Sequence, residues 1–268
     1  LFPIIYALSR LFHFKIHAPV VGGELDIQLQ KRPLLRRLYR KIDSILPQTE
    51  ELKESLESKF GYRNVHLLHN FRVTAERKPP ARDFHNATPL KMVFMARVEP
   101  MKGVDTLFEL DRAITEKRLD ATIDLYGPIL PSYRKKFEES LHSSAKIRYC
   151  GVLAPEDVHD ALSEYHLMLL PTRYRNEGFP GTLLDCYLTA LPFIVTEWRY
   201  AREFVENGYS GMITPFNDDR SFIEQTVELI QNRDLLAKLS RGAAEYGQKY
   251  SSEEGWKILN RHLKVAKR

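Results

Sequence analysis

Hydrophobic and polar positions follow two different patterns that divide the sequence near residue 90. From Leu90 onward, short apolar runs alternate with amphipathic stretches. The runs are Lys91–Ala96, Ala121–Tyr126, Ile147–Cys150, His166–Leu170, Pro192–Thr196 and Gly211–Thr214. Because runs that are apolar on both sides are typical of strands buried on both faces, they indicate a parallel sheet. The helices between them predict right-handed βαβ units and a doubly wound, Rossmann-like α/β domain.

The first 71 residues are less regular. Short apolar runs predict three strands, at His17–Val21, Ser44–Pro47 and Val65–Leu68. A helix is expected over Glu50–Lys59, because Thr49 is a good N-cap and Gly61 a good terminator. Three short strands cannot close a sheet core alone, so this block predicts the second half of an α/β domain.

A basic amphipathic helix is expected within residues 31–43. Its apolar face would carry Leu34, Leu35, Leu38 and Ile42, and its basic face Arg32, Arg36, Arg37, Arg40 and Lys41. A helix of this kind can lie on an anionic lipid surface. It can equally be an ordinary packed helix with a solvated basic face, and the sequence leaves both open.

The domain organisation follows from these patterns. Residues 72–89 are charged, contain prolines and have no periodicity, which predicts an interdomain linker. We therefore expect a partial α/β domain in 1–71, a complete one in 90–250 and a last helix in 251–268 that packs back on the first part. Since the chain opens inside an apolar pattern, we expect it to continue a segment that precedes it.

The composition and charge of the chain exclude few classes of function. A net charge of +5 and a pI near 9.0 fit a phosphate-rich ligand, an anionic membrane or a nucleic acid. Tyr174 and Tyr200, both near arginines, are thin support for nucleic acid, which we do not expect as a partner. Cys150 and Cys186 lie in apolar patterns and predict reduced core cysteines of a cytosolic protein. No run reaches the roughly 20 apolar residues of a membrane span.

The stretch from Pro171 to Trp198 carries the strongest signal for a binding site. A strand ends in a polar loop, and a glycine-containing turn then opens a helix near Gly181. The free N–H groups of the helix start, near Thr182 and Leu183, predict an anion site. Gly178 and Gly181 would let the backbone approach closely and take unusual dihedral angles.

Two cations follow the first strand of the complete domain. Arg97 and Lys102 lie five positions apart at its carboxyl end, where ligands bind in doubly wound folds. A bidentate arginine and a mobile lysine there could clamp a diphosphate. On position alone, solvated loop charges are equally compatible.

Glu177 and Asp185 form a carboxylate pair with several interpretations. Acid–base catalysis is one, and recognition of sugar hydroxyl groups is another. A metal site would need a third ligand at a suitable spacing, which is missing, and the helix dipole alone would account for Asp185. Histidines 13, 17, 66, 69 and 85 have no Cys or Asp at a useful spacing. The sequence also lacks the motifs of serine hydrolases, P-loop proteins and dinucleotide enzymes.

These residues resemble the retaining glycosyltransferases of family four, which have the two-domain GT-B fold. The segment Glu177–Asp185 is similar to the E-x7-E motif of that family, with Asp in the second place, and Ala96–Gly103 is similar to its first basic motif. The resemblance implies that 90–250 is the C-terminal nucleotide-sugar-binding domain. It implies that 1–71 is the second half of the N-terminal, acceptor-side domain.

The resemblance also implies the chemistry: transfer of a sugar from a nucleotide-diphosphate sugar to an acceptor hydroxyl, with retention and without a metal or other cofactor. Carried over by position, Arg97 and Lys102 neutralise the leaving diphosphate, Glu177 binds the donor sugar and Asp185 holds the ribose. Further substrate contacts would come from Gly178, Phe179, Pro180, Gly181 and Thr182, with Gly151 and Val152 meeting the base.

The expected partners are a nucleotide-sugar donor, a sugar or lipid-linked acceptor and an anionic membrane surface. The resemblance suggests cell-surface polysaccharide or glycolipid synthesis on the cytoplasmic, inner face of a membrane. The family's glycine-rich loop and most of its acceptor contacts precede the part matched here, so we expect this chain alone to turn over poorly. The alternative is a non-catalytic nucleotide-sugar-binding subunit that a partner chain completes.

Overall fold

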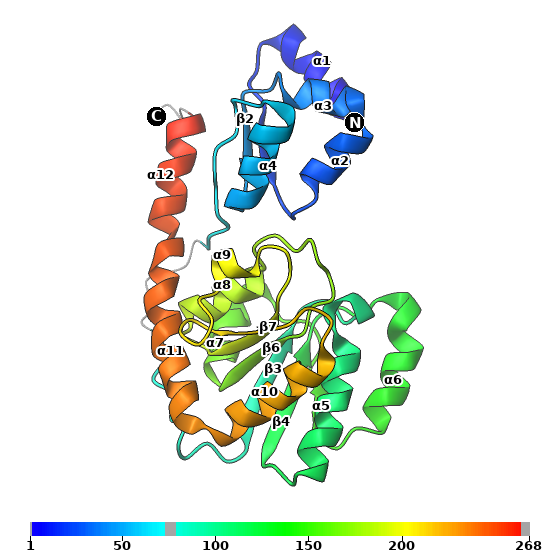
Figure 1. Ribbon diagram of the computed structural model, residues 1–268, viewed down its shortest axis with the longest axis vertical. Helices are drawn as coiled ribbons and strands as arrows, with labels where there is room; N and C mark the ends of the chain where they lie inside the picture. The colour runs from blue at the N-terminus through cyan, green and yellow to red at the C-terminus, as the bar shows by residue number, and fades with distance from the viewer. Residues whose placement is uncertain (1, 73–78, 264–268) are drawn as a thin grey trace. The chain divides into compact units, whose positions relative to one another are not determined.

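The computed structural model describes residues 2–72 and 79–263, which form two compact units (Figure 1). The first unit comprises residues 2–72, 176–180 and 250–263, and the second comprises 79–175 and 181–249. The chain therefore passes from one unit to the other after Arg175, Pro180 and Lys249.

A six-stranded parallel sheet forms the centre of the second unit. Its strands are β3 (Leu90–Met95), β4 (Ala121–Tyr126), β5 (Ile147–Tyr149), β6 (Leu167–Leu170), β7 (Phe193–Thr196) and β8 (Met212–Thr214). The spatial order is β5-β4-β3-β6-β7-β8. The predicted α/β class is confirmed, and each strand lies within one residue of its expected ends.

Helices cover both faces of this sheet. They are α5 (Val104–Glu116), α6 (Arg134–His142), α7 (Val158–Ser163), α8 (Gly181–Leu188), α9 (Ala201–Phe204), α10 (Asp219–Gln231) and α11 (Arg233–Gly247). Helix α5 packs beside α10, while α7 and α11 pack beside α8 (Figure 1). Aliphatic and aromatic side chains of the central strands, including Phe94, Leu169 and Ile194, are fully buried between these layers.

The strand order reverses between β3 and β6. The chain runs outward through β4 and β5 on one side of β3, and through β7 and β8 on the other side of β6. In open parallel sheets a crevice forms at the carboxyl ends of the two strands where the order reverses. In this unit the order reverses at β3 and β6, whose carboxyl ends therefore mark the position where such a crevice is expected.

Part of the predicted linker is packed against the second unit. The Arg82 guanidinium donates to the carbonyls of Leu162, Tyr165 and Thr189. Phe84 is buried, and its ring meets that of His166 edge-on at 6.1 Å. Residues 73–78 of the same stretch lie outside the described residues.

The first unit contains a two-stranded parallel sheet. Strand β1 (His17–Val20) pairs with β2 (Ser44–Pro47), as expected. The prediction of a third strand over Val65–Leu68 is wrong, since this segment makes a single parallel bridge from Val65 to Ile45. The N–H of Leu68 still donates to the Pro47 carbonyl, but proline has no N–H to return the bond, so the ladder stops.

Five helices of the first unit fall within the described residues. They are α1 (Phe2–Phe12), α2 (Leu25–Lys31), α3 (Pro33–Tyr39), α4 (Glu50–Phe60) and α12 (Ser252–Leu263). The predicted cap of α4 is confirmed: Thr49 Oγ1 accepts the Leu52 N–H at 3.2 Å, and Gly61 is left-handed with φ 63°. Helix α12 meets the segment after residue 68 through Trp256 and Phe71, whose rings lie 6.0 Å apart.

Helix α3 differs from its prediction in two respects. It ends at Tyr39, and Ile42 is buried beyond the helix rather than on its face. Leu34, expected on the apolar face, is 63% exposed. Arg36 and Arg37 are exposed as expected, whereas the Arg40 guanidinium donates to the Phe60 carbonyl.

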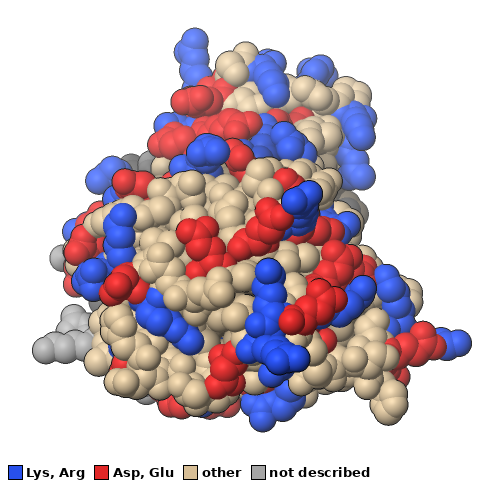
Figure 2. Space-filling view, turned by 60° about the horizontal axis from the view of Figure 1, so that its bottom comes forward, with Lys and Arg blue, Asp and Glu red and all other residues tan. Residues whose placement is uncertain are grey.

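Charged side chains do not form a continuous field on the face drawn in Figure 2, where basic and acidic groups are interspersed. This mixture agrees with the small net charge. Across residues 2–72 and 79–263, no helix is long and apolar enough to cross a bilayer.

Candidate functional site

The loops after β3 and β6 meet at the point where the strand order reverses. Gly103 has φ 76°, and a Cβ at this position would lie 1.8 Å from the Pro171 carbonyl oxygen. The Thr182 hydroxyl, in the first turn of α8, donates to the Met95 carbonyl at the end of β3 (2.7 Å). Two segments about 80 residues apart in the sequence are therefore held together by backbone contact.

The two predicted cations lie on the loop after β3 and have different environments. Arg97 is 64% exposed, and its Nη2 lies 3.1 Å from a carboxylate oxygen of the buried Glu99. Lys102 is only 8% exposed, with its Nζ 5.8 Å from the centre of the Tyr174 ring. Because burying an ammonium group is costly without compensation, Lys102 is not the solvated loop charge that the sequence left open.

Helix α8 begins at Gly181 beside this loop, and its first-turn residues Gly181 and Thr182 are half-buried. Its N-terminal N–H groups are the type of donor that binds phosphate, and the helix dipole adds to their effect. Asp185 is on the second turn and almost fully buried. Its Oδ1 lies 3.4 Å from Nε2 of His159 on α7.

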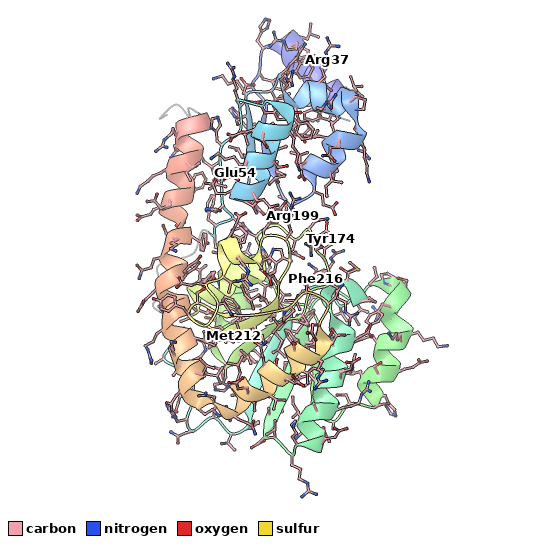
Figure 3. All side chains as sticks on the ribbon, viewed as in Figure 1. Arg37, Glu54, Tyr174, Arg199, Met212 and Phe216 are labelled. Carbon is pink, nitrogen blue, oxygen red and sulfur yellow. The ribbon has the colours of Figure 1, made fainter. Side chains whose placement is uncertain are left out.

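Aromatic and basic side chains extend the site along the carboxyl ends of the later strands. Tyr174, Arg199 and Phe216 lie near one another at this edge (Figure 3). The Arg175 guanidinium is 5.5 Å from the centre of the Phe216 ring, and the Arg175 carbonyl accepts the Arg199 N–H at 2.9 Å. This edge of the unit thus offers further cations held against flat apolar surfaces.

Arg173, which the sequence placed in the same polar loop, has a structural partner instead. Its Nη2 donates to Asp219, at the start of α10, and to the Thr106 hydroxyl on α5. The Thr106 hydroxyl in turn donates to the other oxygen of Asp219 (2.8 Å). This network fixes the loop after β6 to the two helices that cover one face of the sheet.

The expected base contacts follow β5, two strands away from the point of reversal. Gly151 has φ 83°, and its carbonyl accepts the Gly127 N–H at 2.8 Å. Val152 is 66% exposed at the same edge. An exposed apolar group there is compatible with a flat ring lying against it.

The remaining predicted site residues belong to the first unit. Asn176 donates to Glu24, and its carbonyl accepts the Gly23 N–H at 3.0 Å. The Phe179 N–H donates to Gln48 Oε1 (3.2 Å), and the Phe179 ring lies 4.6 Å from that of Tyr250. Glu177 is half-buried, and Pro180 is buried.

These contacts alter two expectations for the turn. Gly178 does not use a left-handed dihedral angle, but a Cβ there would lie 2.8 Å from Gln48 Oε1 and 3.1 Å from Gly22 Cα. A side chain at position 178 is therefore excluded by the closeness of Gln48 and Gly22, and not by an unusual backbone dihedral angle. The N–H of Phe179, one of the residues expected to contact the substrate, already has Gln48 as its acceptor.

A second titratable cluster lies on β4. The buried Asp124 carboxylate accepts a forked pair of hydrogen bonds from Arg148 (3.0 and 2.6 Å) and another from the Tyr165 hydroxyl (2.7 Å). Burial, first of all, raises the pKa of Tyr165 well above its usual value. Since all its members are matched to one another, this cluster is structural rather than reactive. Burial also raises the pKa of the Cys186 thiol, as expected for a core cysteine.

No three His, Cys, Asp or Glu side chains cluster as metal ligands in the part of the chain that the structure describes. The sequence did not single out His159, Glu99 or Gln48, which contact residues of the candidate site. No local signal marks these three, since each meets its partner only through tertiary packing or a turn in the loop.

The sequence matches the model of a protein family that is described as glycosyl transferases group 1. The match spans residues 89–232, just over half of the chain. The chain belongs to this family, that of the family-four glycosyltransferases with the GT-B fold. The resemblance inferred from the sequence is thus confirmed.

Several known proteins are similar to it. An uncharacterized glycosyltransferase of Methanocaldococcus jannaschii is 27% identical over 164 residues, which cover 60% of this chain and 44% of that protein. The O-antigen chain mannosyltransferase C of Escherichia coli is 23% identical over 233 residues, or 80% of this chain and 60% of its own. The chain therefore spans about half the length of the curated relatives it matches.

A solved structure shows the same fold at greater coverage. HepE of Anabaena, in complex with UDP, superposes with a TM-score of 0.79 at 14% identity. The match covers 97% of this chain and 74% of that one. At this identity, the similarity supports the GT-B fold alone.

Proposed function

We propose that this chain is the donor-binding part of a retaining glycosyltransferase. It would transfer a sugar from a nucleotide-diphosphate sugar to an acceptor hydroxyl in the synthesis of a cell-surface polysaccharide or glycolipid. The observation that carries this proposal is the meeting of the Arg97–Lys102 loop with the start of α8 where the strand order reverses. Family membership and an O-antigen mannosyltransferase among the relatives support it.

The site has the donors that a diphosphate requires. Negative charge develops on the departing phosphate in the transition state, and fixed positive groups at that point lower the barrier. Arg97 and Lys102 would supply the cations, and the N–H groups near Thr182 would supply aligned dipoles.

To bind a diphosphate, the Arg97 guanidinium would have to exchange its present ion-pair partner for the phosphate oxygens. Its present partner is Glu99, at 3.1 Å, and a diphosphate would compete with that carboxylate for the same guanidinium. Only the arginine of this pair is exposed, since Glu99 is buried, so drawing Arg97 away would leave a buried carboxylate without this partner. The greater charge of the diphosphate would have to offset that cost.

The remaining proposed contacts are those expected from the family resemblance. Asp185 would accept hydrogen bonds from the ribose, and Gly151 and Val152 would meet the base. Glu177 would bind the donor sugar, within the segment that Gln48 and Tyr250 hold on the first unit. No metal or other cofactor is required by this mechanism.

Calorimetric titration of the chain with UDP, GDP and ADP tests the proposal. We expect saturable binding of one diphosphate, and a loss of about 100-fold or more in the variant Arg97→Ala/Lys102→Ala, which removes two charge-assisted contacts. The matched control is Arg112→Ala/Lys117→Ala, which removes two exposed cations from the α5 end of the same unit. Equal affinities in both variants would refute the diphosphate site.

The alternative is a nucleotide-sugar-binding subunit that needs a second chain for activity. It remains relevant because the chain spans about half the length of its relatives. Transfer of a labelled sugar by this chain alone would exclude it, whereas transfer that appears only on mixing with a partner chain would support it. The proposed setting is the cytoplasmic side of a membrane that carries the acceptor, with the exposed arginines of α3 against anionic lipid.

A further inference from the structure

We propose that His159 is a positioning residue, which holds the Asp185 carboxylate in the orientation that recognises the two ribose hydroxyls of the donor nucleotide. The inference rests on the proposed function and deepens it. It concerns a residue outside both sequence motifs that point to the site.

The geometry brings the two side chains together from neighbouring helices. His159 is on the first turn of α7 and Asp185 is on the second turn of α8, and the two helices pack against each other. Nε2 of His159 lies 3.4 Å from Oδ1 of Asp185. The side chains are 19% and 5% exposed, so the contact is shielded from bulk water on most sides.

The chemistry of a buried carboxylate explains why such a partner matters. A carboxylate that is removed from water is costly unless donors compensate it. An imidazole nitrogen 3.4 Å from one oxygen supplies a polar partner that compensates part of this cost and restricts rotation of the carboxyl group. Because a carboxylate has about four lone-pair sites, it can still accept from the two hydroxyls of a ribose.

The length of the side chain gives a second reason. The motif that Glu177–Asp185 resembles has Glu in its second place, whereas this chain has Asp, which is one methylene shorter. In this chain the shorter side chain keeps its carboxylate 3.4 Å from the imidazole on α7. We expect a glutamate at position 185 to depend less on this partner.

The two helices are themselves fixed at their far ends. The Arg82 guanidinium donates to Leu162 on α7 and to Thr189 just past α8. This clamp limits sliding of α7 along α8, so a substitution of His159 should change the carboxylate locally without separating the helices. We therefore expect substitution of His159 to change nucleotide binding more than it changes the free energy of unfolding.

The test compares ribonucleotides with nucleotides that lack both hydroxyls. ADP, GDP and UDP and their 2′,3′-dideoxy counterparts are titrated into the wild type, His159→Leu and His159→Gln, with His142→Leu as an exposed control on α6. For the nucleotide that binds, we expect the wild type and the control to prefer the ribonucleotide by about tenfold or more. His159→Leu should lose most of this preference, and His159→Gln, which keeps an N–H donor, should recover part of it.

The outcomes separate the two proposals. If the wild type binds no nucleoside diphosphate, the proposed function fails and this inference fails with it. If the wild type discriminates and His159→Leu discriminates equally well, the donor site stands and the role of His159 is refuted. An equal loss of affinity for both sugars in His159→Leu would also refute it, since that result indicates general damage to the fold. If His159→Leu does not fold, His159→Gln is compared in the wild type and in the Asp185→Glu variant. We expect His159→Gln to reduce the preference for the ribonucleotide in the wild type but not in Asp185→Glu. An equal reduction in both would contradict the inference.

Discussion

The substitution Arg82→Met should destabilise the second unit, because it removes a cation that holds the ends of two helices. The guanidinium donates through Nε to Tyr165 (2.7 Å), through Nη2 to Leu162 (2.9 Å) and through Nη1 to Thr189. These carbonyls lie at or just beyond the carboxyl ends of α7 and α8, where the helix dipole favours positive charge. Methionine keeps much of the side-chain length but none of the five donors.

The expected loss follows from these contacts. Hydrogen bonds from a charged donor contribute about 1.5–3 kcal/mol each. Part of this gain is offset by burial of the guanidinium, which lowers the pKa of Arg82 to about 10. The Leu162 carbonyl also keeps the Tyr165 N–H as a donor. We therefore expect a net loss of about 3 kcal/mol in the free energy of unfolding.

Urea denaturation of the wild type and the variant measures this loss, with thermal unfolding as a second assay. For a unit of this size, each kcal/mol should lower Tm by about 2–4 °C. Arg112→Met is the matched control, since Arg112 is exposed on α5. A change below about 1 kcal/mol in Arg82→Met, or an equal change in the control, would show that these hydrogen bonds do not stabilise the unit as argued.

Three further predictions concern other parts of the chain. Gly103→Ala should lower both stability and nucleotide affinity, because its Cβ would lie 1.8 Å from the Pro171 carbonyl at a left-handed φ; unchanged Tm and affinity would contradict this. Burial, followed by two nearby arginines, lowers the pKa of His166, so the unfolded chain takes up this proton first as the pH falls. Stability should therefore be complete above about pH 6.5 and decline below it, and His166→Asn should flatten the profile in denaturation experiments at pH 5 and 7.5. Arg36→Glu and Arg37→Glu together should weaken sedimentation with vesicles of anionic lipid and leave neutral vesicles unaffected, whereas equal binding by the wild type and the variant would refute a membrane role for α3.

The bounds of the strands in the second unit could be predicted closely because the apolar pattern of the sequence indicates which segments are buried. Most strands are short runs that are apolar on both sides and bounded by polar or turn residues, as in Leu167–Leu170. The failures arose where a single atom or a neighbouring element decided the outcome. Pro47 lacks the N–H that a strand over Val65–Leu68 would require, and Leu34 lies on a face of α3 that no described element covers.

The residues of the candidate site also fall into two groups, those that their position in the sequence selects and those that only tertiary packing reveals. Position after a strand was enough to select Arg97 and Lys102, because parallel strands bring their carboxyl ends to one edge of the sheet. The partner of Asp185 could not be found in this way, since His159 lies 26 positions earlier and reaches it only through the packing of α7 on α8. The acceptor of the Phe179 N–H, Gln48, is more than 130 residues away in the sequence.

The central claim is that a nucleoside diphosphate binds where the loop after β3 meets the start of α8. Amide chemical shifts of the isotope-labelled chain, followed by NMR during titration with UDP, GDP and ADP, test it most directly. We predict that one nucleotide shifts the amides of Lys102, Gly103, Thr182 and Leu183 first and most strongly, with Gly151 and Val152 following. Saturable shifts confined to other residues, with these six unchanged, would contradict the claim.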